Sequence, residues 1–278
     1  MYKAALTLAP SLLQPLNLNG SKAYFMNSRN LDLSAILITL NEEKRISQVI
    51  ASLPEGCEII VLDSGSTDKT VELAKKAGAV VSTRTFDNYA DQKNAALSLA
   101  SRKWILSIDA DEVLSQELSE EINSLLSSSS PPPFKAYRLR RKLIFMEKTM
   151  KFGKTSDQPL RLFLRGEAFF ENAIHERLNF KGKSSSLEGN LYHYSYDSMT
   201  DYFDRFNKYT SKIASNHFVN GKHVSFLHLL RPWSEFLNRY VIRLGFLDGY
   251  PGYCYALLSS LYAFVKYAKL KELYHLRK

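Results

Sequence analysis

The chain is long, rich in apolar residues and strongly basic. It has 278 residues, of which 45% are hydrophobic and 12% aromatic, and its formal net charge is +9. This composition is ample for a large core and suits one large domain, or one domain with an appendage. The charge favours acidic partners, namely phosphates, nucleic acid or an anionic membrane face. A membrane-spanning helix is excluded, because no run reaches the roughly 18 uncharged apolar residues that it needs.

The two cysteines exclude two further classes of protein. Cys57 and Cys254 lie far apart in the sequence, each in an apolar context. We interpret them as buried thiols rather than as a disulfide framework or a zinc site. Such thiols fit a reducing, cytoplasmic setting.

The N-terminus differs in character from the rest of the chain. It resembles a signal peptide in having Lys3 followed by an apolar patch. However, Pro10 and Pro15 interrupt that patch, and no small-residue cleavage pattern follows. We therefore do not expect export. We expect residues 1–30 to form a poorly ordered extension, and Met26 is an alternative start.

Short apolar runs alternate with helical patterns from Leu33 to Ser115. The expected strands are 33–40, 58–64, 79–84 and 104–109, and the expected helices between them are 41–53, 66–78 and 90–101. Continuous apolar strands separated by helices predict an α/β fold, with a parallel sheet that is covered by helices on both faces.

Polar residues follow the expected strands at the points where these end. Asn41 and Glu42 follow the first strand, Asp63 ends the second, and Asp109 and Asp111 end the fourth. In parallel α/β sheets ligands bind beyond the carboxyl ends of the strands. We therefore expect these side chains at one edge of the sheet, where a site forms.

The pattern changes in the second half of the chain. The Ser- and Pro-rich segment 127–133 marks a boundary, after which 136–145, 159–165 and the aromatic segment 168–194 predict further strands. From Asp197 onward the pattern becomes helical. We expect a catalytic domain over 31–195, with halves 33–115 and 134–195, and a helical region over 196–278.

The sequence Asp109-Ala110-Asp111 suits a divalent cation. Mg²⁺ and Mn²⁺ take oxygen ligands and commonly join one or two carboxylates to the phosphates of a substrate. Such an ion would stabilise a leaving diphosphate. Solvated loop acids or helix caps are the structural alternative. No P-loop or dinucleotide-binding glycine motif occurs, which argues against kinase and dinucleotide chemistry.

Four motifs in this order carry a resemblance to a known family. They are AILITLNEE, IIVLDSGSTDKTVELAKKAGA, FDNYADQKNAALSLA and WILSIDADE. Together they resemble the inverting family-2 glycosyltransferases, which have the GT-A fold. They are most similar to the branch that adds glucose to the lipopolysaccharide inner core. The segments PLRLF, NAIHERL, HYSY and LGFLDGYPGY extend the resemblance more loosely.

The resemblance implies a nucleotide-diphospho-sugar donor, UDP-glucose above all, and Mg²⁺ or Mn²⁺ as the cofactor. It implies that Asp63 holds the base and that Lys93 lies near the nucleotide. Asp109 would then contact the ribose and the metal. Asn41 and Glu42 would border the donor pocket, although Glu42 could instead be a first-turn helix acid. The metal ligand would be Asp111.

Inverting transfer also needs a base that accepts the proton of the acceptor hydroxyl. The resemblance makes Glu176 the first candidate and Asp157 the second, while a surface ion pair is the alternative for either. His175 and His193 are candidates to orient the base or to complete the metal shell, and His193 is the one that we expect among the metal ligands. Arg161 and Arg165 are candidates to clamp a phosphate.

The C-terminal region is dense in aromatic and basic residues. The segment 255–278 has helical spacing and a basic end, which is typical of a helix that lies in a membrane interface. We expect a peripheral protein on the inner face of the cell membrane. Packing on a second copy of the chain, as a homodimer, or on the catalytic domain are the alternatives.

The leading functional hypothesis is transfer of a hexose to a lipid-linked glycan such as the lipopolysaccharide core. Transfer to polyprenyl phosphate, a capsule or a protein glycan by the same fold is the second. Sugar-nucleotide sensing without catalysis and nucleic-acid binding are the non-enzyme alternatives. We expect no nucleic-acid partner, because no recognisable motif supports it and acids crowd the edge of the sheet.

Overall fold

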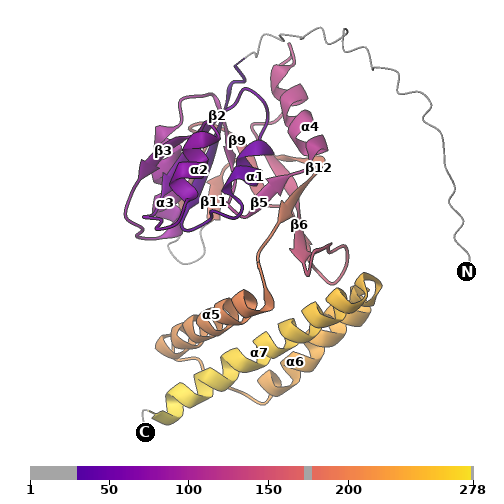
Figure 1. The fold of residues 1–278 in the computed structure, drawn as a ribbon. Coiled ribbons are helices and arrows are strands. Elements are labelled where there is room, and N and C mark those ends of the chain that lie inside the picture. The colour runs from indigo at the N-terminus through magenta and orange to yellow at the C-terminus, as the bar shows by residue number, and fades with distance from the viewer. Residues whose placement is uncertain (1–29, 172–176, 277–278) are drawn as a thin grey trace, which may run out of the picture.

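Residues 30–171 and 177–276 are described by the computed structural model. They form two tiers, a sheet with its covering helices and a layer of C-terminal helices (Figure 1). The first half of the sheet consists of β1 (Leu33–Thr39), α1 (Ile46–Ala51), β2 (Glu58–Asp63), α2 (Thr70–Lys76), β3 (Val80–Thr83), α3 (Tyr89–Leu99) and β4 (Trp104–Ser107). This order confirms the predicted alternation of strands and helices.

The second half of the chain completes the same sheet. Its elements are β5 (Glu112–Leu114), α4 (Gln116–Ser127), β6 (Ala136–Phe145), β7 (Lys148–Thr149), β8 (Ser156–Asp157), β9 (Leu160–Leu164) and β12 (Ser185–His193). A separate hairpin pairs β10 (Ala168–Glu171) with β11 (Arg177–Phe180). The main sheet has the order β3-β2-β1-β4-β9-β6-β12-β5.

Strand direction divides the sheet. The first four strands are mutually parallel, whereas β9 runs antiparallel to both β4 and β6. The fold is therefore the expected α/β fold, with a parallel first half and a mixed second half. Because β4 pairs directly with β9, the two halves share one sheet on either side of the Ser- and Pro-rich segment.

Alternation along the central strand explains the two hydrophobic layers. Leu33, Ala35 and Leu37 pack with residues of α1, α2 and α4, whereas Ile36 packs with residues of α3 on the other face. Successive side chains of a strand point to opposite faces, so a strand covered on both sides is apolar throughout. This is the origin of the continuous apolar run that follows Asp32.

Two local expectations need correction. The first helix begins at Ile46 rather than Asn41, because Asn41 has a left-handed φ of 56° and the Glu42 amide donates to Thr70 Oγ1 at 2.7 Å. Glu42 is therefore a loop residue and not a first-turn helix acid. Helix α4 was not expected from the sequence, although its N-cap Ser115 accepts from the Leu118 amide.

The C-terminal tier confirms the expected helices. It consists of α5 (Met199–Val219), α6 (Leu227–Leu237), the π-helical turn η1 (Asn238–Ile242), the 3-10 turn η2 (Gly245–Asp248) and α7 (Tyr250–Leu276). Tyr202 of α5 and Leu258 of α7 pack with three residues of the sheet tier. Leu143 and Phe145 lie at the end of β6, and Met150 follows β7. One apolar cluster therefore attaches the helices to the sheet.

The motif LGFLDGYPGY makes a tight structural junction in this tier. A Cβ at Gly252 would lie 2.0 Å from the Gly245 carbonyl oxygen, so only glycine allows η2 and α7 to approach this closely. The buried Asp248 carboxylate accepts from the amides of Lys151 and Phe152. The motif thus joins the helical tier to the loop after β7.

Candidate active site

The carboxyl ends of the parallel strands meet at one edge of the sheet. There Asp63 is 1% exposed and is held by the turn that follows it. Its Oδ2 accepts from the amides of Gly65 and Ser66 at 2.9 and 2.8 Å, and its Oδ1 accepts from Thr39 Oγ1 at 3.1 Å. The carboxylate therefore fixes the geometry of the loop after β2, with Gly65 at a φ of +96°.

Asn41 joins this loop to the loop after β1. Its amide donates to Ser66 Oγ at 2.8 Å, and its Oδ1 accepts from the Thr67 amide at 2.9 Å. Asn41 itself is exposed. Asn41 and Asp63 thus hold the loops after β1 and β2 together at the edge of the sheet. The expected contact of either residue with a donor stays a prediction.

A cavity of about 540 Å³ opens beside these two loops. Of the residues that the sequence singled out, it brings together Glu42, Asp109, Asp111 and His193. The aromatic rings of Phe86 and Tyr89 line it from the sheet tier, and Arg205, Lys208 and Tyr209 of α5 line it from the helical tier. The cavity therefore lies between the strand ends and the first C-terminal helix.

Glu42 has an unusual ionisation in this cavity. Burial, and then the negative charge of Asp111, raise the pKa of the Glu42 carboxyl to about 7. Glu42 therefore exchanges its proton near neutral pH. A cation placed at Asp111 would remove part of this effect and favour the ionised carboxylate.

Asp109 lies at the start of a chain of alternating charges. Lys93 Nζ lies 2.8 Å from its Oδ1, and Arg161 donates to its Oδ2. Burial opposes ionisation of Asp109, but the charges of Arg161 and Lys93 outweigh burial and hold its pKa well below the usual range. Asp109 is therefore a firmly ionised carboxylate.

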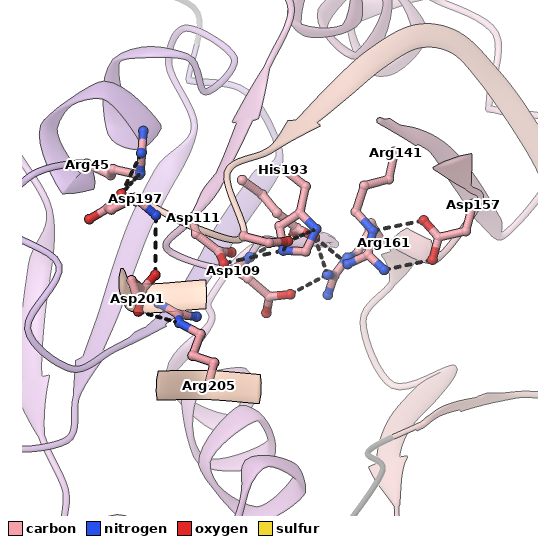
Figure 2. Close-up of polar contacts among 12 residues, drawn as sticks. Arg45, Asp109, Asp111, Arg141, Asp157, Arg161, His193, Asp197, Asp201 and Arg205 are labelled. Carbon is pink, nitrogen blue, oxygen red and sulfur yellow. Dashed lines mark hydrogen bonds and ion pairs between the residues drawn. The ribbon is translucent and has the colours of Figure 1, made fainter. Parts of the chain in front are cut away.

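The same chain of charges continues through Arg161 and Arg141 to Asp157 (Figure 2), and Arg141 also lines the cavity. Arg161 Nη2 lies 2.6 Å from Glu112 Oε1, and Arg141 Nη1 lies 2.8 Å from the same oxygen. Arg141 also donates to both oxygens of Asp157, at 2.9 and 2.7 Å. Glu112 is fully buried, so the two arginines are what allow it to remain charged in the core.

Four further predicted residues lie outside the lining of the 540 Å³ cavity. Lys93 instead lines a neighbouring cavity of about 410 Å³, together with Asp109 and Arg161. Asp157 is exposed and paired with Arg141. Arg161 is buried in its ion pairs and not available to clamp a phosphate, and Arg165 donates to the Ala100 carbonyl.

Asp111 and His193 form the part of the site that suits a cation. Asp111 Oδ2 lies 3.3 Å from His193 Nε2, and both residues line the 540 Å³ cavity. Burial lowers the pKa of His193, but the hydrogen bond and charge of Asp111 outweigh it, so the net shift is upward. One carboxylate and one imidazole fit an ion that takes its other ligands from phosphates and water.

The described residues stop short of a complete protein-only metal site. Among them, no group of three or more His, Cys, Asp or Glu side chains is arranged to hold a metal ion. Asp109, the other predicted ligand, has its two oxygens directed at Lys93 and Arg161. Its role as a metal ligand stays a prediction.

Glu176 and His175, the first candidate base and its neighbour, lie outside the described residues. Four residues of the site were not expected from the sequence. Glu112 and Arg141 complete the charged chain, and Arg205 and Lys208 of α5 reach the cavity. Glu112 follows directly after the two aspartates, and basic residues alternate with apolar ones in β6. That combination was the available signal for buried ion pairs.

Comparison with known proteins agrees with this geometry. Residues 34–128 match the family described as Glycosyl transferase family 2. An uncharacterized glycosyltransferase of Rickettsia typhi is 34% identical over 257 residues, which cover 87% of this chain and 87% of that protein. The lipopolysaccharide core biosynthesis glycosyltransferase LpsC of Rhizobium meliloti is 31% identical and covers 89% of this chain and 94% of its own length.

The fold and the site at the strand ends define an α/β enzyme of GT-A type. The chain belongs to glycosyl transferase family 2 and is a glycosyltransferase. A solved glucosyl-3-phosphoglycerate synthase from Mycobacterium tuberculosis, in complex with Mn²⁺ and UDP, is 26% identical with a TM-score of 0.32. The match covers 40% of this chain and 44% of that one.

Proposed function

We propose that this glycosyltransferase moves a hexose, with inversion, from a nucleotide-diphospho-sugar to a lipid-linked glycan. The observation that carries the proposal is the cavity in which Asp111 and His193 face two cations of α5, Arg205 and Lys208. Acids at the strand ends suit a metal, and cations opposite them suit the diphosphate that the metal binds. The similarity to LpsC supports a lipopolysaccharide core as the acceptor.

In this proposal the donor lies in the 540 Å³ cavity, with UDP-glucose as the first candidate. Mg²⁺ or Mn²⁺, held by Asp111 and His193 with Asp109 as the further predicted ligand, would stabilise the charge that develops on the leaving diphosphate. Arg205 and Lys208 would act on the same charge from the other side. Asp63 and Asn41 would shape the loops against which the nucleotide base lies.

The chain must also supply a base for the acceptor hydroxyl. Asp157 is poorly placed for this role, because Arg141 occupies both of its oxygens. We therefore retain Glu176 as the first choice and Asp157 as the second. Glu176→Gln should retain donor binding and lose turnover, whereas survival of turnover in that variant and its loss in Asp157→Asn would reverse the assignment.

We further propose that the helical tier binds the membrane surface from which a lipid-linked acceptor is taken. No helix in the described ranges is long and apolar enough to cross a membrane. Instead, α6 exposes Leu229, Leu230 and Trp233, the last of these to 72%. Apolar side chains exposed on one helix, with basic residues nearby, are typical of interfacial helices. A homodimer through the same face is the alternative.

Donor hydrolysis across a panel of UDP-, GDP- and ADP-sugars, with Mn²⁺ and with EDTA, tests the enzymatic proposal. We expect hydrolysis of one donor, dependence on the metal, and stabilisation of the protein by that donor in a thermal melt. Absence of both hydrolysis and stabilisation with every donor would refute the proposal. Acceptor assays with lipid-linked glycan, polyprenyl phosphate and protein glycan then separate the acceptor alternatives.

A further inference from the structure

The helical tier contains a second cavity, of about 700 Å³, that the proposed reaction does not use. It lies between α5, α6 and α7, beside the connection 220–226. Its basic and imidazole lining residues are His217, Lys222, His223, His228, Arg231 and Lys266. No carboxylate from the described ranges lines it. The cavity is therefore basic on every side that carries a charge.

These charges lack the compensation that the sheet edge has. Within residues 30–171 and 177–276, neither Lys222, Arg231 nor Lys266 forms an ion pair with a carboxylate. Glu235, the acid whose charge is felt at Lys266, is paired with Arg239 at 2.6 Å. Three uncompensated cations around one cavity create a field that attracts an anion.

The pKa shifts of two lining residues agree with a positive field in the cavity. Burial, and then the charge of Arg231, lower the pKa of Lys266. Burial, followed by the charges of Lys222 and Lys266, lowers the pKa of His217. A bound anion would relieve this mutual repulsion. His217 Nδ1 is shielded from solvent and has no hydrogen-bond partner among the described residues, so no such bond fixes this ring.

Tyr267 gives the cavity a rigid wall. It is 9% exposed, its hydroxyl accepts from Arg231 Nη1 at 3.3 Å, and Lys266 Nζ lies 5.3 Å from the centre of its ring. The His228 ring lies 4.0 Å from the same ring. Cations from two helices are therefore arranged around one buried aromatic residue before any ligand arrives.

We propose that this cavity is a second anion site, which binds the phosphate group of a phosphorylated ligand. Arginine and lysine together with neutral or protonated imidazoles supply the hydrogen-bond donors that phosphate oxygens need. The phosphate is either part of a lipid headgroup or part of a soluble phosphorylated compound. The two sources share this chemistry, and an experiment separates them.

Helix α5 connects the second site to the proposed donor site. Lys208 lines the donor cavity and His217 lines the basic cavity. At 1.5 Å per residue, these positions lie about 14 Å apart along the helix axis. If the proposed function holds, one acceptor that carries a phosphate at about this distance from its reacting end could occupy both sites. This extension rests on the proposed function, whereas the phosphate site itself does not.

The test is a thermal melt in inorganic phosphate at constant ionic strength. It compares the wild type, the double variant Arg231→Gln/Lys266→Gln and the matched control Lys212→Gln/Lys271→Gln, which removes the same charge from exposed positions of the same tier. Phosphate that binds the folded protein raises its melting temperature. We expect an equal rise in the wild type and the control, and at least a tenfold loss of apparent affinity in the cavity variant.

A single variant, Lys222→Gln, guards against misfolding of the double variant, because Lys222 lies in an exposed connection. It should show a smaller loss of the same sign. An equal response to phosphate in the cavity variant and in the control would place the anion elsewhere and overturn the proposal. So would the absence of any response in the wild type to phosphate and to anionic vesicles.

Vesicles of phosphatidylcholine, with and without phosphatidylglycerol, identify the source of the phosphate. Joint loss of the phosphate response and of anionic-vesicle binding in the cavity variant indicates a lipid headgroup. Loss of the phosphate response alone indicates a soluble phosphorylated ligand. Arg231 and Lys266 do not line the donor cavity, so donor hydrolysis should remain in every variant. Failure of the glycosyltransferase proposal would therefore be seen separately.

Discussion

The sheet edge and the helical tier differ in whether their charged side chains have partners of opposite charge. At the edge, Asp109, Glu112 and Asp157 alternate with Arg161 and Arg141, so each buried charge has a partner. In the helical tier, cations surround a cavity without a facing acid, and α6 leaves apolar side chains exposed. The charges of this alternating chain are compensated within the protein, whereas, among the described residues, the charges around the cavity of the helical tier are not.

This difference separates stability from binding. Removal of a charge from this paired chain should destabilise the fold, because its partners would remain buried and unpaired. Removal of a charge from the helical tier should leave the fold intact and weaken only the binding of a partner. Four predictions test this contrast, from the largest expected effect to the smallest.

The largest effect is expected for Arg161→Met. This change leaves Glu112 with Arg141 alone and Asp109 with Lys93 alone, in a setting where Glu112 is fully buried. Breaking a buried ion pair from one side costs about 3–5 kcal/mol in the free energy of unfolding. Urea denaturation followed by circular dichroism measures the loss.

Arg165→Met is the control for this variant. Arg165 lies just beyond the same strand, is exposed, and makes one hydrogen bond to the Ala100 carbonyl. Its replacement should cost about 1 kcal/mol or less. Equal losses in the two variants would contradict the view that the charged chain is a structural unit.

Asp111→Asn should affect function rather than stability. Asp111 is part of the proposed cation site and forms an ion pair with His193. Loss of several kcal/mol of charge stabilisation at the leaving group corresponds to a fall in turnover of about 100-fold or more. Stabilisation by Mn²⁺ with donor should disappear in the melt. Asp87→Asn, at an exposed pair with Arg84, should retain both, and retention in Asp111→Asn as well would remove Asp111 from the metal site.

Glu42 makes stability depend on pH. Its pKa is about 7 in the folded protein and about 4.5 in the unfolded chain, so the folded state holds more protons between these values. Its contribution to stability is fully present below about pH 4.5 and is lost as the pH rises through 7. Glu42→Gln should therefore equal the wild type at pH 4.5 and exceed it at pH 8.

The expected gain of Glu42→Gln at pH 8 is about 1–2 kcal/mol, after allowance for the partial exposure of Glu42. Melts in EDTA measure it, because a cation at Asp111 would reduce the repulsion. Glu43→Gln, at a neighbouring exposed acid, should show a smaller difference between the two pH values. If the difference in stability between Glu42→Gln and the wild type stayed constant from pH 4.5 to 8, the pKa of Glu42 would not be raised by burial and by the charge of Asp111.

The sequence predicted the sheet edge well for a physical reason. Continuous apolar strands must be covered on both faces, so Leu33 to Thr39 could hardly form anything but a central strand. Polar residues directly after such strands must gather at one edge, and this placed Asp109 and Asp111 beside the same cavity. The local apolar pattern gives the order of strands and helices, and this order gives the edge of the sheet at which the strands end.

The rest depended on contacts between distant segments. The acids up to Glu112 and the basic residues of β6 indicate buried ion pairs, but no local pattern identifies Arg161 and Arg141 as the partners of Glu112. Asp63 carries the expected acid, yet its oxygens are used by its own turn, as Asp-Ser-Gly sequences allow. The basic cavity brings together four segments, so its cations, spaced from Lys222 to Lys266, formed no local motif.

The smallest effect is expected for the apolar face of α6. Trp233→Gln should weaken binding to anionic vesicles by about tenfold, since partial burial of a large side chain in lipid contributes about 1–2 kcal/mol. Vesicle sedimentation measures it. Val80→Gln, at a side chain 65% exposed on β3, is the control and should have no effect. If Trp233→Gln left vesicle binding unchanged and shifted a monomer–dimer equilibrium instead, the exposed face would belong to a second copy of the chain.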